Sequence, residues 1–158
     1  MEDHAAASMG MGTALVRTSF LIDAVYAAAG RDFDLTIPQA QVLCVLIPRP
    51  YGMFELAKTL GLAKSSITGL VDRCEKRDLV RRESDPSDGR ASRVALTAKG
   101  KQLAEEFHDT TTRRVAELTL GLTGPERDTL AALLTRVVVD NRVPAVFTDG
   151  DCPSDPDA

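Results

Sequence analysis

Apolar positions along the chain recur mostly with the spacing of helices, and one strand-like stretch lies near the middle. Over residues 12–29 they return every three or four positions, which predicts an amphipathic first helix that is ended by Gly30 and the polar RDFD at residues 31–34. Residues 37–47 are apolar almost throughout, so we expect a buried second helix there. Thr36 and Gln39 have the spacing of a capping box at its start. The sequence PRPYG at residues 48–52 then predicts a break in the chain.

Two short helical patterns and two strand-length runs follow this break. Residues 54–60 predict a helix that has Gly52 as its N-cap and stops at Gly61, and residues 64–77 predict a second helix after a tight turn. Residues 79–83 and 93–96 have the length of strands, and the loop between them contains an Asp-Pro and an Asp-Gly turn pair. This order of elements predicts a helix-turn-helix followed by a β-hairpin.

Two more helices complete the pattern. Thr97 is placed to cap a helix that runs to about residue 120, with an inward stripe made by Leu103, Phe107, Arg114 and Leu118. Thr123 and Glu126 form a second capping box, which begins a last helix that runs to about residue 141. Its inward positions are expected to be Leu130, Leu133, Leu134, Val137 and Val138. Residues 1–11 are expected to be flexible, and the acidic tail 144–158 is expected to be disordered.

Composition limits the classes of protein to consider. A chain of 158 residues allows one domain with a real core. No apolar run is long enough to cross a bilayer and no secretory signal is apparent, so we expect a cytoplasmic protein. The three cysteines lie far apart, with Cys44 and Cys74 at core positions and Cys152 in the polar tail, which predicts neither a disulfide nor a metal site. Nucleophile–base pairs and phosphate-binding glycine loops are missing, so we expect neither catalysis nor a cofactor.

Charge is distributed unevenly along the chain. The net charge is −4, but residues 49–101 contain 12 Lys/Arg and 7 Asp/Glu, a net of +5. The remainder contains 7 basic and 16 acidic residues, a net of −9. A basic centre in an acidic protein is typical of a local phosphate-binding surface, although a solvated face of mixed charge has the same composition.

The polar residues of the basic centre suit contact with DNA. In the helix at residues 64–77, short polar residues begin at the N-terminus, where free N–H groups favour phosphate. Lys64 and Arg73, with Lys76 beyond them, add positive charge. Arg90 lies at the end of the hairpin turn, where no packing role requires an arginine and where a guanidinium can enter a minor groove. The alternative for Arg90 is a surface ion pair with Asp85 or Asp88.

Residues 54–97 resemble the MarR family of winged helix-turn-helix transcription regulators. The resemblance rests on the recognition-helix sequence KSSITGLVDRCEKRDLVRR and on the wing sequence DGRASRVALT, and it extends to the order of helices along the whole chain. It implies a mostly α fold with a small β-hairpin wing, in one domain over residues 12–143. In this fold a winged helix-turn-helix at about residues 37–97 is flanked by dimerisation helices at about residues 12–30 and 97–141.

The resemblance also implies which residues contact DNA. Arg90 would enter the minor groove with the help of Asp88, and Arg93 would meet phosphate. The full expected set is Lys64, Ser65, Ser66, Thr68, Gly69, Arg73, Asp88, Arg90 and Arg93. Two positions depart from the family pattern, because Gly69 replaces a larger residue and Ala63 replaces a capping Ser or Asp.

Family members are homodimers that repress transcription from palindromic operators, and many release DNA when a phenolic or lipophilic effector binds between the dimerisation helices and the winged domain. Candidate effector contacts in this chain are Arg17, Tyr26, Phe33, Phe107 and His108. Two alternatives stay open. One is a redox-responsive regulator of the same family, and the other is a winged-helix module that binds protein and does not read DNA.

Overall fold

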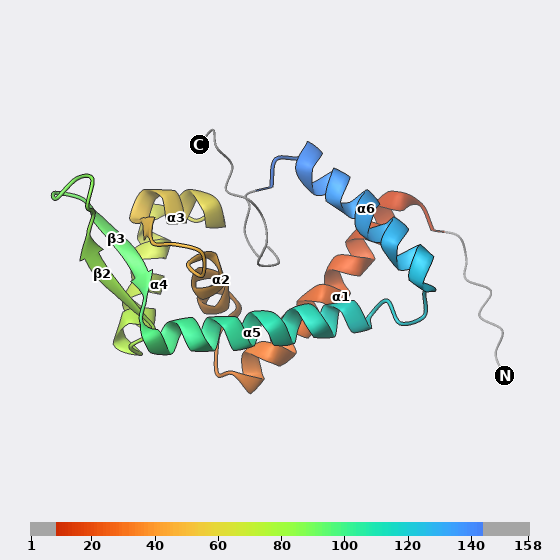
Figure 1. The fold of residues 1–158 in the computed structure, drawn as a ribbon, viewed down its shortest axis with the longest axis horizontal. Coiled ribbons are helices and arrows are strands. Elements are labelled where there is room, and N and C mark those ends of the chain that lie inside the picture. The colour runs from red at the N-terminus through yellow and green to blue at the C-terminus, as the bar shows by residue number, and fades with distance from the viewer. Residues whose placement is uncertain (1–8, 144–158) are drawn as a thin grey trace.

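The computed structural model describes residues 9–143 as six helices and a three-stranded sheet (Figure 1). The mostly α fold with a small β wing is therefore confirmed. Expectations for residues 1–8, for the tail 144–158 and for Cys152 lie outside the described residues. In chain order the elements are α1 Met11–Asp32, α2 Ile37–Val45, β1 Tyr51–Gly52, α3 Met53–Leu60, α4 Lys64–Lys76, β2 Val80–Ser84, β3 Ser92–Leu96, α5 Ala98–Glu117 and α6 Gly124–Asp140.

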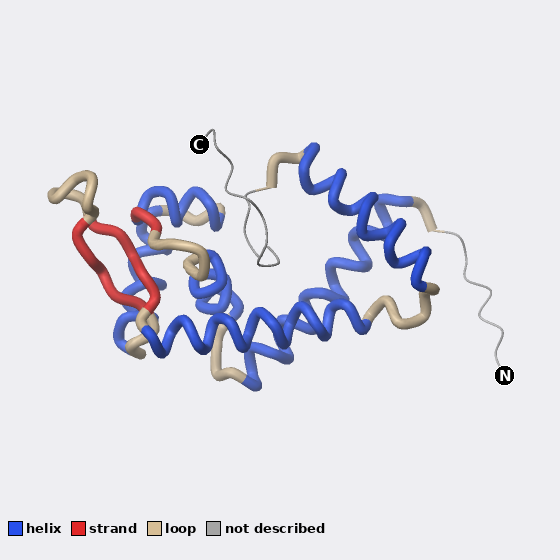
Figure 2. Tube along the Cα trace, in the orientation of Figure 1, coloured by secondary structure: helices blue, strands red, loops and turns tan. Residues whose placement is uncertain are grey.

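The molecule is elongated, with α5 connecting two ends of different character (Figures 1 and 2). At one end, α2, α3, α4 and the sheet pack together around the start of α5, and the β2–β3 hairpin projects at the periphery. At the other end lie the N-terminal part of α1 and all of α6. None of the helices in the described part has the length and apolar character needed to cross a membrane.

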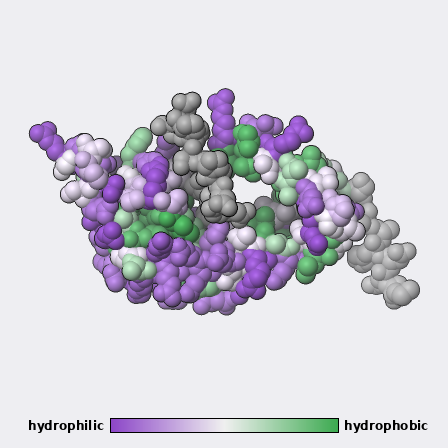
Figure 3. All heavy atoms as spheres, in the orientation of Figure 1, coloured by the Kyte–Doolittle hydropathy of each residue, from purple (hydrophilic) through white to green (hydrophobic). Residues whose placement is uncertain are grey.

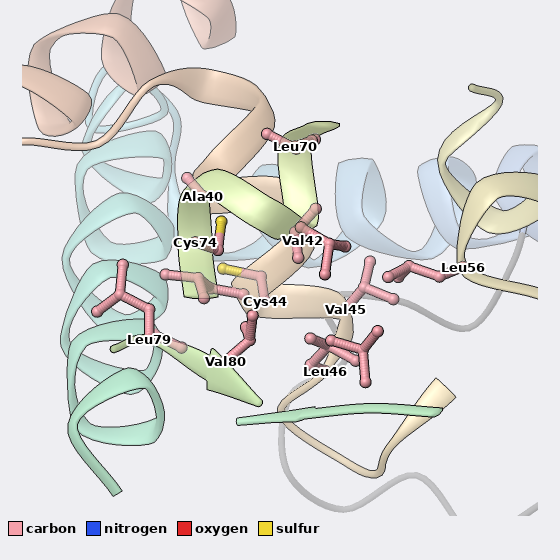
Figure 4. Close-up of a cluster of buried hydrophobic side chains, with 14 of the residues drawn as sticks. Ala40, Val42, Cys44, Val45, Leu46, Leu56, Leu70, Cys74, Leu79 and Val80 are labelled. Atoms are coloured by element: carbon pink, nitrogen blue, oxygen red, sulfur yellow. The ribbon is translucent and has the colours of Figure 1, made fainter. Parts of the chain in front are cut away.

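Helix α2 lies at the centre of the core, as its apolar sequence predicts. Val42, Leu43 and Val45 are completely buried. In Figure 4, side chains of α2 meet Leu70 and Cys74 of α4, together with Leu79 and Val80 at the start of β2. Burial of this aliphatic cluster holds α4 against the rest of the winged part, because each fully buried side chain contributes about 1.5–3 kcal/mol.

Side-chain caps begin the helices where the sequence predicts them. The backbone N–H of Thr36 donates to Oε1 of Gln39 at 3.0 Å, and the N–H of Gln39 donates to Oγ1 of Thr36 at 3.3 Å, so the capping box of α2 is confirmed. Before α5, the N–H of Gly100 donates to Oγ1 of Thr97 at 2.9 Å. Before α6, the N–H of Thr123 donates to Glu126 at 2.8 Å.

The first helix passes Gly30 and ends within the polar RDFD segment, which was also expected to end it. Helix α1 continues through Gly30 to Asp32, and Asp34 adopts the left-handed conformation with φ 50°. The N–H of Leu35 then donates back to the carbonyl of Gly30 at 2.8 Å. A Cβ atom on Gly30 would lie 2.6 Å from the Leu35 carbonyl oxygen. Gly30 therefore allows the close return of the chain at Leu35. The left-handed residue after the helix is Asp34, because Asp tolerates this conformation.

A third strand lies in the segment that we expected only to break the chain. Tyr51 pairs with Val94 and Gly52 pairs with Arg93, so the sheet order is β1-β3-β2. A two-residue strand has no periodicity to detect. The Arg49 guanidinium stacks 3.9 Å from the centroid of the Tyr51 ring and bonds to Glu55 at 2.5 Å, which fixes the start of α3 beside the sheet.

The inward positions expected on the last two helices differ from those observed. On α5, Phe107 is buried and Leu103 is partly buried, but Leu118 is 44% exposed and Arg114 pairs with Asp32 at 2.7 Å. On α6 all five expected core residues are 37–52% exposed in the single chain. Leu15, Val16, Phe20 and Leu21 of α1 are exposed as well. Hydrophobic surface is visible at this end of the molecule in Figure 3.

Candidate nucleic-acid interface

Helix α4, the expected recognition helix, has one buried apolar face and one exposed polar face, as the sequence predicts. Gly61, in the left-handed conformation with φ 64°, ends α3 and allows the tight turn into α4. The buried residues of α4 are Ile67, Leu70, Val71 and Cys74. Its other face leaves Lys64, Ser65, Ser66, Thr68 and Arg73 exposed, and Gly69 half-buried.

The N-terminus of α4 has no side-chain cap. Ala63 is the N-cap residue and accepts no hydrogen bond through its side chain. The hydroxyl of Thr68 donates to the Lys64 carbonyl at 2.9 Å, so it is turned along the helix. The N–H groups of the first turn are consequently available to an external acceptor, and the helix dipole favours an anion there.

Two substitutions of Ala63 are expected to separate stability from DNA contact. A serine restores the missing cap, so Ala63→Ser is expected to raise the free energy of unfolding by about 1 kcal/mol. An aspartate caps equally well but adds a negative charge at the terminus, so Ala63→Asp is expected to stabilise the protein and to bind DNA more weakly than Ala63→Ser. Urea unfolding and fluorescence anisotropy with labelled duplex measure the two effects. Unchanged DNA affinity in Ala63→Asp would show that phosphate does not approach this terminus.

Gly69 is not required by packing within the chain. A Cβ atom built on it would meet only the Arg73 guanidinium, at an ordinary contact distance of 3.5 Å. Two explanations remain, a close approach of the helix backbone to DNA and a base contact that is simply missing.

The wing, formed by β2, β3 and the loop at residues 85–91, presents Arg90 to solvent. The carboxylate of Asp88 accepts the backbone N–H of Arg90 at 3.0 Å, and the N–H of Ala91 donates to the Asp88 carbonyl at 2.8 Å. Asp88 therefore orders the backbone of the tip and does not hold the guanidinium. Within residues 9–143, Arg90 forms no ion pair, so the surface-pair alternative is not observed.

Hydrogen bonds to Ser87 also order this loop. The backbone N–H and the hydroxyl of Ser87 donate to Asp85 at 2.8 and 2.6 Å. They lower the pKa of the Asp85 carboxyl, because they stabilise its charged form.

Arg93 is engaged within the protein. Its Nε donates to Glu83 at 2.7 Å across the β2–β3 pair, and Arg81 also reaches Glu83 at 3.2 Å. Arg93 in particular holds the pKa of Glu83 below its usual value. A phosphate contact by Arg93 stays a prediction, and it would have to compete with Glu83. Among residues 37–101, all of which the structure describes, the basic residues that form no ion pair are Lys58, Lys64, Arg73, Lys76, Arg90 and Lys99.

Two features beside α4 were not predicted from the sequence. Arg82 of β2 bonds to Asp72 and Glu75 of α4. A cavity of about 530 Å³ also opens between α3, α4 and β2, next to Phe54, which is 84% exposed. Its lining includes Met53, Leu62, Lys64 and Thr68. No local pattern indicates either feature, because both depend on how the hairpin packs on the helix pair.

The structure brings together only part of the expected effector set. Tyr26 and Phe33 contact the ring of Phe107 edge to face, with centroids 6.0 and 5.6 Å away. Phe107 is buried in the core, and Tyr26 borders a cavity of about 220 Å³ with Ile37 and Gln41. Arg17 is exposed on α1, nine residues before Tyr26, and His108 is half-buried on α5. An effector site stays a prediction.

Both described cysteines are buried thiols. Burial raises the pKa of Cys44 to about 12, and burial also raises the pKa of Cys74. Because the thiolate is the form that reacts with oxidants, neither environment favours a redox response. In residues 9–143 no group of three His, Cys, Asp or Glu side chains is arranged to hold a metal ion.

Comparison with known proteins gives a match to a family model and matches to solved structures. The chain matches the model of the MarR family over residues 33–91. It is similar to the Multiple Antibiotic Resistance Repressor MarR, with 28% identity, a TM-score of 0.74, and coverage of 84% of this chain and 97% of that chain. It is also similar to a cysteine-to-serine mutant of MarR from E. coli complexed with operator DNA, with 28% identity, a TM-score of 0.66 and coverage of 81% and 93%. An S. aureus MepR mutant bound to an oligodeoxyribonucleotide shares the fold, with 20% identity, a TM-score of 0.59 and coverage of 85% and 99%.

Proposed function

We propose that this chain, which belongs to the MarR family of DNA-binding transcription regulators, acts as a homodimeric repressor that an effector releases from a palindromic operator. The proposal rests on the presence of two features in one chain. The N-terminus of α4 has no side-chain cap, and Arg90 is exposed and forms no ion pair among residues 9–143. The first suits phosphate and base edges in a major groove, and the second suits a minor groove. Repression is supported by the similarity to a protein described as a repressor.

Exposed apolar residues on α1 and α6 support the homodimer. The two helices expose, among others, Phe20 at 68%, Leu133 at 52% and Val139 at 67%. Large apolar residues exposed together on two helices indicate an interface, and a second copy of the chain supplies a matching surface through two-fold symmetry. Two recognition helices in such a dimer would meet half-sites roughly 34 Å apart.

Gel shifts with the DNA upstream of the gene, titrated in salt, test the proposal. We expect specific binding that is roughly a thousandfold tighter than binding to random duplex and that weakens steeply with salt as phosphate contacts are lost. Equal affinity for both duplexes at physiological salt would contradict the function as a sequence-specific regulator.

A winged-helix module that binds protein is the second candidate, and Phe54 favours it. This large aromatic side chain is 84% exposed beside the apolar cavity between α3 and α4. The gel shift distinguishes the two candidates, because a protein-binding module requires no preference among duplexes.

The dimer is tested by charge introduced on α6. Leu133→Glu is expected to weaken self-association at least about tenfold, because the interface would have to bury an unpaired carboxylate. Light scattering coupled to size exclusion would then record a mass falling toward the 17.0 kDa of one chain. Thr135→Glu, at an exposed polar position of the same helix, is the control and is expected to stay dimeric. A Leu133→Glu protein with the parent's mass at all concentrations would place the interface elsewhere.

A further inference from the structure

Arg82 joins the wing to the recognition helix. Its Nη2 donates to Oδ1 of Asp72 at 2.5 Å, and its Nη1 donates to Oε2 of Glu75. Two-thirds of the Arg82 side chain is buried, since 32% of it remains exposed. The planar guanidinium can bond to two carboxylates at once with little loss of freedom, whereas a lysine offers a single point charge.

The position of Arg82 follows from the alternation of strand β2. Val80 is buried toward the core, and Arg82, two residues later, lies on the same face of the strand. On α4, Asp72 and Glu75 are three residues apart and therefore lie on one side of the helix. One side chain of the wing thus meets two side chains of the helix.

The neighbouring arginines of the hairpin make no such bridge. Arg81 donates to the Leu96 carbonyl at 2.7 Å and to Glu83 at 3.2 Å, and Arg93 pairs with Glu83 at 2.7 Å. Their partners all belong to β2 or β3, so these bonds stiffen the hairpin internally. Within the described structure, Arg82 is the ion-pairing residue that links the hairpin to α4.

We propose that Arg82 is a positioning residue for DNA binding, which sets the angle between the wing and α4 and offsets part of the negative charge of Asp72 and Glu75 beside the DNA. This inference rests on the proposed function. Arg90 is eight residues along the chain from Arg82, in the loop that forms the far end of the hairpin (Figure 1), so a small rotation of the hairpin displaces this loop by a larger amount. A wing that rotates freely would lose the simultaneous fit of α4 and Arg90 to adjacent grooves. Without Arg82, two carboxylates would also repel nearby phosphates.

A matched pair of variants tests the role of Arg82 on DNA. Arg82→Met and Arg81→Met remove the same charge from the same strand and keep a similar apolar stem. We expect Arg82→Met to bind the operator about tenfold or more weakly and to lose hydroxyl-radical protection at the minor-groove position of the wing. Arg81→Met is expected to stay within about threefold of the parent and to keep the footprint. Circular dichroism confirms that both variants fold.

The outcome that would overturn the proposal is equally specific. If Arg82→Met keeps the parent's affinity, preference and wing footprint, Arg82 has no positioning role. If its affinity falls equally for operator and random duplex with the footprint intact, Arg82 is a simple phosphate contact.

A second measurement separates this inference from the proposed function, because it uses no DNA. Spin labels replace Ser92 at the start of β3 in the wing and Lys58 on α3, in protein with Cys152→Ser and diluted with unlabelled chains. We expect one narrow distance distribution in the parent and in Arg81→Met, and a broad one in Arg82→Met. If the distribution broadens in Arg82→Met but the parent protein binds no DNA specifically, the proposed function is contradicted and the link between wing and helix is supported. An unchanged distribution in Arg82→Met would remove the link.

Discussion

Arg90→Ala is expected to weaken operator binding by roughly 30-fold or more, because the proposed dimer would lose about 1 kcal/mol or more at each of its two wings. The guanidinium is exposed at the wing tip, and Asp88 orders the backbone beneath it through a hydrogen bond of 3.0 Å to the Arg90 N–H. The loop is therefore already formed before DNA arrives, so little of the binding free energy is spent on ordering it. Anisotropy titrations at several salt concentrations measure the loss.

Two further variants show which property of Arg90 is used. Arg90→Lys keeps the charge and loses the planar fork, so an intermediate affinity is expected from the more strongly hydrated ammonium group. Arg127→Ala removes the same charge from exposed α6, far along the chain from the winged part, and is expected to leave DNA binding nearly unchanged. An Arg90→Ala protein that binds the operator as tightly as the parent would exclude the wing from the interface.

Gly100→Ala is expected to lower the free energy of unfolding by about 3 kcal/mol or more, a large part of the 5–15 kcal/mol typical of a domain. A Cβ atom at this position, in the first turn of α5, would lie 1.8 Å from the Leu79 carbonyl oxygen and 2.7 Å from its carbon. That carbonyl accepts the N–H of Thr97 at 3.1 Å. The clash therefore cannot be relieved without breaking this hydrogen bond, which holds the start of α5 against Leu79.

Gly124→Ala is the matched control for this effect. Gly124 begins α6, and a Cβ atom there would meet no atom within 4 Å apart from those of its neighbours in the chain. The change is expected to stay within about 1 kcal/mol, because the gain in helix propensity is opposed by the contact of the new methyl group with the ring of Pro125. Urea unfolding of the three proteins compares the midpoints and slopes. A Gly100→Ala protein as stable as the parent would mean that α5 can shift away from Leu79.

Several local features were predictable because each depends on residues a few positions apart. The buried face of α4, the capping box of Thr36 and Gln39, and the helix stop at Gly61 all follow from spacing along a single element. The hairpin follows from its turn pairs in the same way. The fold class and the presence of Arg90 at an exposed tip therefore needed no knowledge of long-range contacts.

Other features were missed because the residue that completes each of them is distant in the sequence. Strand β1 exists only because β3 offers a free edge to Tyr51 and Gly52. The α6 residues expected in a core are exposed because their apolar stripe has no partner within residues 9–143 of one chain. Periodicity identifies an apolar face but does not say whether the same chain or a second copy covers it.

By itself, the sequence determined the order of the helices, the position of the wing and the separation of α4 into a buried and a polar face, since these depend on local periodicity and turn chemistry. Only the tertiary structure decided how the charges of the basic centre are used. Arg82 and Arg93 lie in the same basic segment as Arg90, yet packing of the hairpin brings Arg82 to Asp72 and Glu75 and Arg93 to Glu83. Arg90 stays exposed because its loop extends beyond the helices that could supply a carboxylate. Charge pairing depends on distance in space, and the sequence does not contain those distances.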